Sequence, residues 1–299
     1  MENERYMKQK EYLSKEDYVL IEALQKECLG KDGIALKLEL DYKLAIAKAS
    51  EETGSKNEIN EFMYFDNDSL VGYIGICGFG GALEINGMVH PDYRKQGIFS
   101  ALNEKVMEEC KRRKSKEVLI LSDKKSSEGQ RFIQKLNVSY DHTEYEMYLR
   151  KDFEMPSKEQ LCGVSFRKAM NSDAQEIARQ NVIYFDDEDS SPEGMILPEV
   201  EEKRGMTIYL AIKDDQIIGK IHLETNKEPA GIFGLGVLPE YRGKGYGRAV
   251  LLGGIRKMME DHAKQIMLQV LTENATALNL YTSCGFEETS TMDYYKVNL

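Results

Sequence analysis

A long internal repeat constrains this chain more than any other feature of its sequence. The segment VHPDYRKQGIF, at 89–99, matches VLPEYRGKGYG, at 237–247, so that Arg94 falls opposite Arg242 at an offset of 148 residues. Solenoid repeats have periods of about 20–50 residues. A period this long therefore indicates two copies of one domain, and 299 residues are enough for two domains of ordinary size.

The repeat extends on both sides of this segment. Upstream, SLVGYIGI at 69–76 resembles QIIGKIHL at 216–223 at an offset of 147 residues, so one small insertion or deletion separates the two matches. Downstream, 131–149 falls opposite 279–297, again at an offset of 148 residues. We therefore expect the two copies to share the same order of secondary-structure elements.

Apolar periodicity predicts that the second copy alternates strands with helices. Strands are expected at 164–170, at 207–225 as a hairpin around Asp214 and Asp215, and at 231–238, 265–271 and 291–298; helices are expected at 172–185, after Gly245 and at 275–284. Hairpins combined with strand–helix alternation are typical of a mixed sheet. The predicted fold class is α/β, with two tandem domains that each form a mixed twisted sheet with helices on both faces.

The repeat also predicts the limits of the domains. An N-terminal domain is expected over 1–150, a linker over 151–162 and a C-terminal domain over 163–299. Pro156 and a charged, weakly periodic run mark the linker. In the first copy two helices are expected before Phe62, and no opening strand is apparent ahead of them.

Charge and composition narrow the classes of function. The formal charge is −11, whereas a nucleic-acid-binding protein needs a basic face. This charge is compatible with a cationic small-molecule substrate, or with solubility alone. The five cysteines are odd in number and form no CxxC pair, which favours free thiols in the cytoplasm. The four histidines are scattered, so no metal site is expected, and no stretch is apolar over the length that a bilayer requires.

The glycine-rich turn PEYRGKGYG lies between a predicted strand and a predicted helix. Successive backbone N–H groups at a helix N-terminus form a concave anion site. Gly245 allows a positive φ, and Gly247 lets a phosphate approach the backbone without a Cβ in the way. Arg242, Lys244 and Arg248 add positive charge around a pyrophosphate. The same residues would also fit an ordinary turn with basic surface side chains.

Two segments resemble the signatures of the GNAT superfamily, the GCN5-related N-acetyltransferases. The acyl-CoA-binding signature is a Gln or Arg, two free positions, Gly, one free position and then Gly or Ala; Arg242, Gly245 and Gly247 match it. In the second signature an Asn precedes a helix that carries a Tyr, and Gly-Phe follows. The matching residues are Asn274, Ala277, Tyr281, Gly285 and Phe286. The resemblance covers most of 163–299 and, more weakly, 62–150, and the layout is similar to tandem acetyltransferases of the mycothiol-synthase type.

The resemblance implies acetyl-CoA as the co-substrate. The implied binding residues lie on the strand before the turn, in the turn and at the starts of two helices: Leu235, Gly236, Val237, Arg242, Gly243, Lys244, Gly245, Tyr246, Gly247, Arg248 and Asn274. In the family this strand splays from its neighbour, and its backbone binds the pantetheine arm like an added strand. Gly234 and Gly236 are poor strand residues and fit such a distorted strand, although a bulge without a ligand would need them too.

The resemblance also implies catalytic residues. Aminolysis of a thioester expels a thiolate that a nearby hydroxyl can protonate, and the family pattern places Tyr281 at that spot; a core tyrosine is the structural alternative. Phe233 and Gly234 stand where members often carry a basic carboxylate, so Glu224 on the preceding strand is the acidic candidate for the general base. A relay through water is the other possibility at this step.

The first copy departs from the pattern at several of these positions. Phe99 falls opposite Gly247, and Ile133 falls opposite Tyr281. Since isoleucine has no proton to give, the first copy is expected to be a diverged domain that does not catalyse. Near the second copy's first helix, Asp186, Asp187, Glu188 and Asp189 either attract an amine or form a solvated loop.

These observations predict an acetyl-CoA-dependent N-acetyltransferase that acts on a primary amine of a small molecule, with the chemistry in the C-terminal domain. The expected partner is a small-molecule amine, with no nucleic acid, no membrane and no metal. One alternative is a protein N-terminal or lysine acetyltransferase. Another is a non-catalytic acyl-CoA-binding regulatory protein, against which the intact Tyr281 and Asn274 argue.

Overall fold

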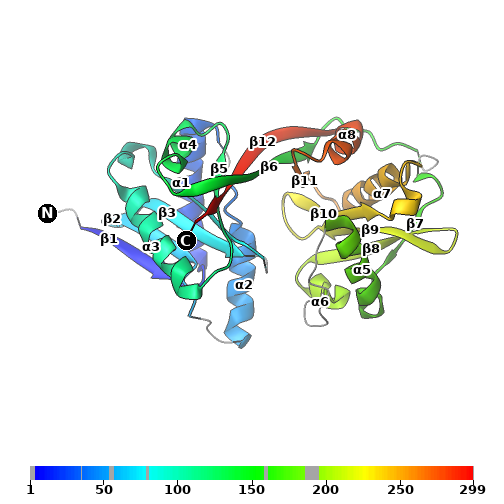
Figure 1. The fold of residues 1–299 in the computed structure, drawn as a ribbon, viewed down its shortest axis with the longest axis horizontal. Helices are drawn as coiled ribbons and strands as arrows, with labels where there is room; N and C mark the ends of the chain where they lie inside the picture. Colours follow the sequence, from blue (N-terminus) through cyan, green and yellow to red (C-terminus); the bar gives the residue numbers. More distant parts are fainter. Residues whose placement is uncertain are drawn as a thin grey trace. The chain divides into compact units, whose positions relative to one another are not determined.

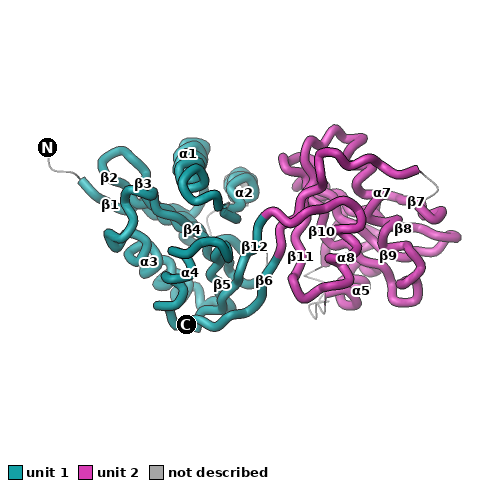
Figure 2. Tube along the Cα trace, turned by 90° about the horizontal axis from the view of Figure 1, so that it is seen from above, with its two compact units in different colours: residues 1–144, 290–299 teal, residues 145–289 magenta. Residues whose placement is uncertain are grey.

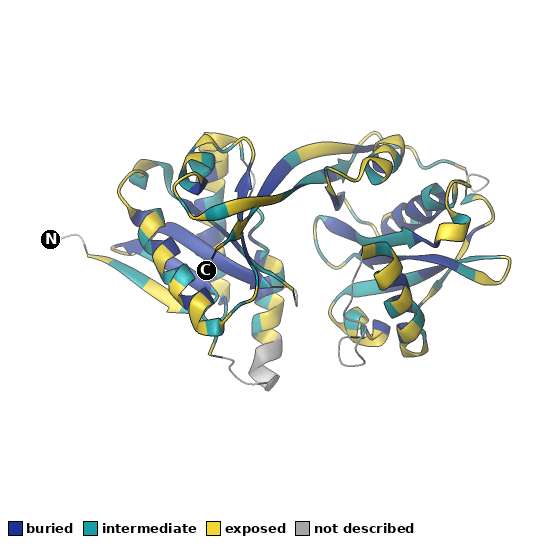
Figure 3. Ribbon diagram, viewed as in Figure 1, coloured by how far each residue is buried: buried dark blue, intermediate teal, exposed yellow. Residues whose placement is uncertain are grey.

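The chain forms two compact units. The computed structural model describes residues 4–34, 36–53, 57–78, 81–157, 161–185 and 195–298, with the backbone alone over 49–53. Unit 1 comprises residues 1–144 and 290–299, and unit 2 comprises residues 145–289 (Figure 2). Buried residues gather on the strands and on the inward sides of the helices within each unit (Figure 3).

Unit 1 is built on a mixed set of strands in the order β1-β2-β3-β4-β5-β12. β4 and β5 run parallel, and the other neighbours run antiparallel. The elements are β1 (Arg5–Lys10), α1 (Lys15–Asp32), α2 (Leu40–Thr53), β2 (Glu61–Asp66), β3 (Ser69–Gly78), β4 (Leu83–Val89), α3 (Ile98–Arg113), β5 (Val118–Asp123), α4 (Ser127–Ile133), the start of β6 (Val138–Leu149) and the end of β12 (Phe286–Val297) (Figure 1).

Helices cover both faces of the unit 1 sheet. Ile74 and Ile76 on β3 belong to a buried cluster that includes Leu102 of α3. Tyr73, the neighbour of Ile74, belongs to a second cluster that includes Ile21 of α1. Because successive strand residues point to opposite faces, α3 and α1 pack on opposite faces of the sheet.

Unit 2 repeats this architecture. β7, β8, β9 and β10 form an antiparallel series, and β11 joins β10 in parallel. The elements are β7 (Ser165–Lys168), α5 (Ala174–Phe185), α6 (Pro198–Lys203), β8 (Met206–Lys213), β9 (Gln216–Glu224), β10 (Ala230–Val237), α7 (Tyr246–Glu260), β11 (Ile266–Leu271) and α8 (Ala275–Ser283). On β8, Leu210 packs in a cluster with Ile177 of α5, whereas its neighbour Ala211 packs in the cluster that contains Ile255 of α7. The predicted α/β class, with helices on both faces of a mixed sheet, is thus confirmed.

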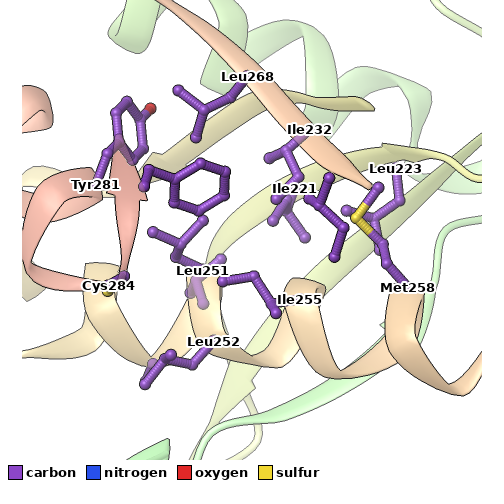
Figure 4. Close-up of a cluster of buried hydrophobic side chains, with 14 of the residues drawn as sticks. Ile221, Leu223, Ile232, Leu251, Leu252, Ile255, Met258, Leu268, Tyr281 and Cys284 are labelled. Atoms are coloured by element: carbon purple, nitrogen blue, oxygen red, sulfur yellow. The ribbon is translucent and has the colours of Figure 1, made fainter. Parts of the chain in front are cut away.

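The packing of α7 explains much of the order in unit 2. Ile255 and Met258 are fully buried and lie beside Ile221 and Leu223 of β9 (Figure 4). A Cβ on Gly254 would lie only 2.5 Å from Cδ1 of Ile221. Glycine at this position therefore lets the helix approach the sheet closely, and the close contact fixes where α7 begins relative to β10.

The first unit opens with a strand, so the expectation that it lacks one is wrong. β1 pairs antiparallel with β2, from Arg5 opposite Asp66 to Lys10 opposite Glu61. Only Tyr6 and Met7 among its apolar residues are half-buried, and the rest of the strand is polar. An edge strand of this kind carries no clear apolar alternation, because charged residues protect the exposed edge. Helix α6 is a second element that the periodicity did not predict.

The units differ from the predicted domain limits of 1–150 and 163–299. β12 pairs antiparallel with β5, from Met292 opposite Asp123 to Lys296 opposite Leu119. The last ten residues of the chain therefore belong to unit 1. Conversely, Met147 near the end of β6 lies in the core of unit 2. A repeat shows that two copies exist, but it does not show which sheet a terminal strand joins.

We expect truncation after Thr289 to destabilise unit 1. Met292 and Tyr294 pack against Leu119 and Leu121, and the loss of a buried side chain of this size costs about 2–5 kcal/mol. Hydrogen exchange over 118–123 should accelerate strongly, because β5 loses its antiparallel neighbour. Replacing Lys296, whose partner Glu117 is exposed, with Ala is the matched control and should change little. Unchanged exchange over β5 in the truncated chain would contradict the assignment of β12 to unit 1.

Candidate active site

The strand β10 parts from β11 midway along its length. The parallel register between them covers Ala230–Ile232, opposite Ile266–Leu268, and ends there. β10 continues to Val237 with β9 as its ladder partner. The backbone groups of β10 that face away from β9 beyond Ile232 therefore have no partner from β11, and such an open strand edge can bind an extended ligand as an added strand. The predicted residues Leu235, Gly236 and Val237 lie on this segment.

A bulge interrupts β10 at the point where it opens. Phe233 pairs with His222 and Gly236 pairs with Lys220, so two residues of β10 oppose the single residue Ile221 of β9. Gly234 adopts a φ of +53°. The ladder between β3 and β4 in unit 1 has no such shift. The change in the repeat offset from 147 to 148 residues is thus located at this bulge.

The glycine-rich turn leads directly from β10 into α7. Gly243 and Gly245 have φ angles of +74° and +82°, and Gly245 is the N-cap of α7. The first helical hydrogen bond runs from the Ala249 N–H to the Gly245 carbonyl. The N–H groups over 246–248 therefore have no partner within the helix, and glycine at the N-cap supplies no side chain to satisfy them. This arrangement suits an anion.

The basic side chains of the turn are held by neutral groups. Arg242 Nε donates to the Val237 carbonyl at 2.9 Å, and Lys244 Nζ donates to the Glu240 carbonyl at 2.9 Å. Arg248 donates to the hydroxyl and the carbonyl of Ser283 at 2.7 Å and 2.9 Å. Among the described residues no carboxylate pairs with these three basic groups, so their positive charge remains available to a ligand.

The first residues of α7 pack loosely against their neighbours. A Cβ on Gly247 would meet Leu280 Cδ2 at 3.6 Å, which is ordinary contact, so packing alone does not require glycine there. Tyr246 is half-buried, with its ring 6.2 Å from that of Tyr241. The two rings meet edge to face at the start of α7.

The helix α8 carries the predicted Asn274 and Tyr281. The Asn274 side-chain oxygen accepts the Ala277 N–H at 3.0 Å and thereby caps the helix. Tyr281 is 9% exposed and packs edge-on to Phe286, with its hydroxyl directed away from Leu251 (Figure 4). That hydroxyl has no hydrogen-bond partner among the described residues. Burial raises the pKa of Tyr281, so the hydroxyl keeps its proton at neutral pH.

The structure does not bring Glu224 to the opening between β10 and β11. Glu224 pairs in register with Gly231, where β10 and β11 are still joined. Its carboxylate lies 2.8 Å from the ammonium of Lys227. Three residues of strand separate Gly231 from the bulge at Gly234, which is about 10 Å. The acidic run 186–189 lies outside the described residues.

Sequence reasoning did not single out Lys220 and His222, which lie beneath the bulge. Lys220 is fully buried; its Nζ donates to the Gly234 carbonyl at 3.0 Å and lies 3.3 Å from His222 Nε2. Burial lowers the pKa of Lys220 to about 7. Burial, followed by the nearby charge of Lys220, holds the pKa of His222 well below its usual value. A lysine inside the apolar strand QIIGKIHL was the available signal.

Unit 1 has the same turn with different partners. Gly97 is the N-cap of α3 with a φ of +82°, and Lys95 adopts a φ of +61° in the place of Gly243. Arg94 Nε donates to the Val89 carbonyl, as Arg242 does in unit 2. The Arg94 guanidinium, however, forms a two-bond ion pair with Asp32 at 2.9 Å and 2.6 Å. A carboxylate of the chain itself thus neutralises the charge that the turn offers in unit 2.

The described segments show no sign of a membrane span or a metal site. Within them, no helix combines the length and the apolar character that crossing a bilayer requires. Nor do three or more His, Cys, Asp or Glu side chains gather there as metal ligands would. The glycine-rich turn and the opening of β10 remain the features with the clearest binding chemistry.

One known protein family matches both halves of the chain. The acetyltransferase (GNAT) family model matches residues 21–137 and again 172–286. A mycothiol acetyltransferase of Kocuria rhizophila is 33% identical over 93 residues, which are 29% of this chain and 31% of that protein. The N-alpha-acetyltransferase 30 of Saccharomyces cerevisiae is 36% identical over 83 residues, which are 27% of this chain and 47% of that protein. The chain thus matches these relatives over less than half of their length.

Solved structures share the fold over the whole chain. A GCN5-related N-acetyltransferase from Sphaerobacter thermophilus has a TM-score of 0.75 at 17% identity and covers 98% of this chain and 95% of its own. A tandem GNAT protein from the clavulanic acid biosynthesis pathway has a TM-score of 0.68 at 13% identity and covers 98% of each chain. At such identities the likeness shows the fold.

The buried amine of Lys220 predicts how stability depends on pH. An unfolded lysine has a pKa of about 10.4, whereas the folded state lowers the pKa to about 7. Between these values the unfolded chain binds more protons, so the free energy of unfolding rises with pH, and the penalty of burying the charge is fully present below about 7. We expect the difference in melting temperature between Lys220→Met and wild type to favour the variant most at pH 6–7 and to shift toward the wild type as the pH rises to 9. A difference that does not vary with pH would contradict this.

Proposed function

The chain belongs to the acetyltransferase (GNAT) family, and on that premise we propose that it transfers an acetyl group from acetyl-CoA to the primary amine of a small molecule. We place the chemistry in unit 2. One arrangement supports the proposal most directly. β10 opens away from β11 after Ile232, and a basic turn at the N-terminus of α7 follows directly along the chain.

The residues of unit 2 fit acetyl-CoA. Free N–H groups over 246–248 and the unneutralised Arg242 suit a pyrophosphate. The open edge of β10 at Leu235, Gly236 and Val237 suits an extended arm with amide groups. The exposed amide of Asn274 uses only its oxygen in capping α8, which leaves its N–H groups to donate to a ligand. These groups would together hold and orient the thioester.

Tyr281 is the proposed general acid. The amine nitrogen forms a bond to the thioester carbonyl carbon, the carbon–sulfur bond breaks, and the departing sulfur takes a proton from the Tyr281 hydroxyl. The hydroxyl supports this role, because it is protonated at neutral pH and no group among the described residues competes for its proton. Its ring packing against Phe286 fixes the direction of the hydroxyl.

The amine must lose a proton for the reaction to balance. Glu224 shares one face of β9 with Lys220 and His222, since the three alternate along the strand. Because Glu224 lies about 10 Å along the strand from the bulge, a water molecule is one proposed proton acceptor at the opening, and Glu224 is kept as the other proposed general base. The ion pair with Lys227 would have to loosen for Glu224 to act.

The proposed division of labour rests on three differences in unit 1. Asp32 pairs with the Arg94 guanidinium in its turn. Its β4 has no bulge. Ile133, which is buried at the end of α4, stands where unit 2 has Tyr281. Each difference changes a feature that the proposed reaction uses in unit 2, so we propose that unit 1 does not catalyse.

Wild-type protein should release thiol from acetyl-CoA in the presence of a small primary amine. A panel of small amines, lysine peptides and peptides with free N-termini would be screened by thiol detection. Release with peptides alone would favour a protein acetyltransferase, a reading to which the match with the yeast N-alpha-acetyltransferase lends support. Binding of acetyl-CoA without release in any reaction would contradict the proposed activity and favour a regulatory acyl-CoA-binding protein.

Arg242→Ala and Arg94→Ala form a matched pair for this screen. We expect Arg242→Ala to weaken acetyl-CoA binding about tenfold or more, since charge-assisted hydrogen bonds to phosphate are strong. Arg94→Ala should leave the affinity for acetyl-CoA and the turnover nearly unchanged, because the Arg94 guanidinium is already paired with Asp32. Calorimetry and steady-state rates would measure both. Equal losses of affinity and turnover in the two variants would contradict the proposal that unit 1 does not catalyse.

Tyr281→Phe should lower kcat with nearly unchanged acetyl-CoA affinity. General acid catalysis is worth about 10²–10⁴-fold, and we expect the lower end because a thiolate is a good leaving group. Phenylalanine keeps the ring that packs on Phe286, so the fold should persist. Pre-steady-state acetyl transfer at saturating coenzyme would compare the two proteins. Equal rates would indicate that water or another group protonates the departing sulfur.

A further inference from the structure

We propose that Lys220 is a positioning residue that holds the bulge of β10 in the form that presents the acyl end of the coenzyme to the acceptor. The inference rests on the proposed function for its catalytic consequence. Its structural core is a single hydrogen bond, from Lys220 Nζ to the Gly234 carbonyl at 3.0 Å. No other side chain among the described residues donates to that carbonyl.

The bulge creates the need for this donor. Gly234 and Leu235 together oppose Ile221, so the regular ladder between β9 and β10 is interrupted there. A backbone carbonyl that leaves the ladder and faces the protein interior costs free energy unless a donor satisfies it. Lys220, which pairs in register with Gly236 two residues away, supplies the donor from within the same sheet.

The surroundings of Lys220 indicate a role other than ion pairing. Its Nζ lies 5.6 Å from the ring centre of Tyr184 and 5.2 Å from that of Phe185, both on α5. The titratable and charged groups that face it are His222 on its own strand, Tyr184 from α5 and, beyond the Tyr184 ring, Arg242. The neighbouring strands contribute Leu210, Gly234 and Gly236 at this level. Among the described residues no carboxylate compensates the amine.

Unit 1 provides an internal comparison. Tyr73 occupies the position of Lys220, and its hydroxyl donates to Glu61 at 2.5 Å. The buried Lys43 completes this network with bonds of 3.1 Å to Glu61 and to Tyr73. β4 has no bulge, and the network makes no bond to a β4 carbonyl. The bulge and the unpaired lysine thus occur together in unit 2, and both are missing from the equivalent strands of unit 1.

The bulge determines where the open edge of β10 lies. It sits between Ile232, the last residue paired with β11, and Val237, which precedes the basic turn. A change in the bulge would shift Leu235 and Gly236 relative to the turn, and with them the thioester. Misplacement of reacting groups by about 1 Å can reduce a rate by about 10².

Lys220→Met tests the inference in the full-length protein. Methionine fills the space but cannot donate to the Gly234 carbonyl. We expect faster hydrogen exchange over 230–237, a smaller loss of coenzyme A affinity than in Arg242→Ala because the turn is untouched, and kcat lowered about 10²-fold. The exchange measurement needs no substrate. If wild type acetylates no amine, the proposed function fails, while the exchange result still decides whether Lys220 holds the bulge.

Two further variants complete the test. Gly234→Ala strains the bulge without touching Lys220, because its φ is +53° and its Cβ would lie 2.9 Å from His222 Nδ1, so it should reproduce the faster exchange and the lower kcat. Lys43→Met is the control, since Lys43 is a buried lysine of unit 1. It leaves the buried Glu61 carboxylate without its cation, so it should lower stability without changing exchange over 230–237. Wild-type exchange and wild-type kcat in Lys220→Met, with both altered in Gly234→Ala, would overturn the inference.

Discussion

The end of the ladder between β10 and β11 at Ile232 is the constraint on which the candidate site depends. Beyond that residue the backbone of β10 keeps its partners on β9 and exposes its other edge. The chain then turns through Gly243 and Gly245 into α7, whose first N–H groups have no partner within the helix. Two sets of unsatisfied backbone donors and acceptors thus follow one another along one short segment, and the close packing of α7 on β9 holds them in place.

The two units show how one backbone can serve different purposes. Their turns have nearly equal φ and ψ angles at Arg94 and Arg242, and both arginines bond a carbonyl at the end of the preceding strand. The two arginines differ in whether a carboxylate pairs with the guanidinium. In unit 1 Asp32 pairs with Arg94, and Glu61 pairs with a buried lysine. In unit 2 neither Arg242 nor the buried Lys220 has a carboxylate partner among the described residues, which leaves them able to act on a ligand or on the backbone.

Sequence reasoning succeeded where the signal is local. The glycine positions of the turn, the helix that follows and the helix that begins after Asn274 all lie where their spacing predicted. It failed where the signal depends on neighbours distant in sequence. β1 was missed because an edge strand shows no apolar alternation. The register of Glu224 with Gly231 could likewise not be read from the sequence, and its role as the general base stays a prediction.

The sequence by itself determined the duplication, the alternation of strands and helices, and the basic glycine turn at the start of α7, because periodicity and turn chemistry act over a few residues. Only the tertiary structure decided which sheet the last strand joins, with Met292 opposite Asp123. It also decided the partner of each buried charge: Asp32 reaches Arg94 across 62 residues, whereas Lys220 meets a carbonyl instead of a carboxylate. Long-range pairing and burial set these charges and their pKa values, and neither is encoded in local spacing.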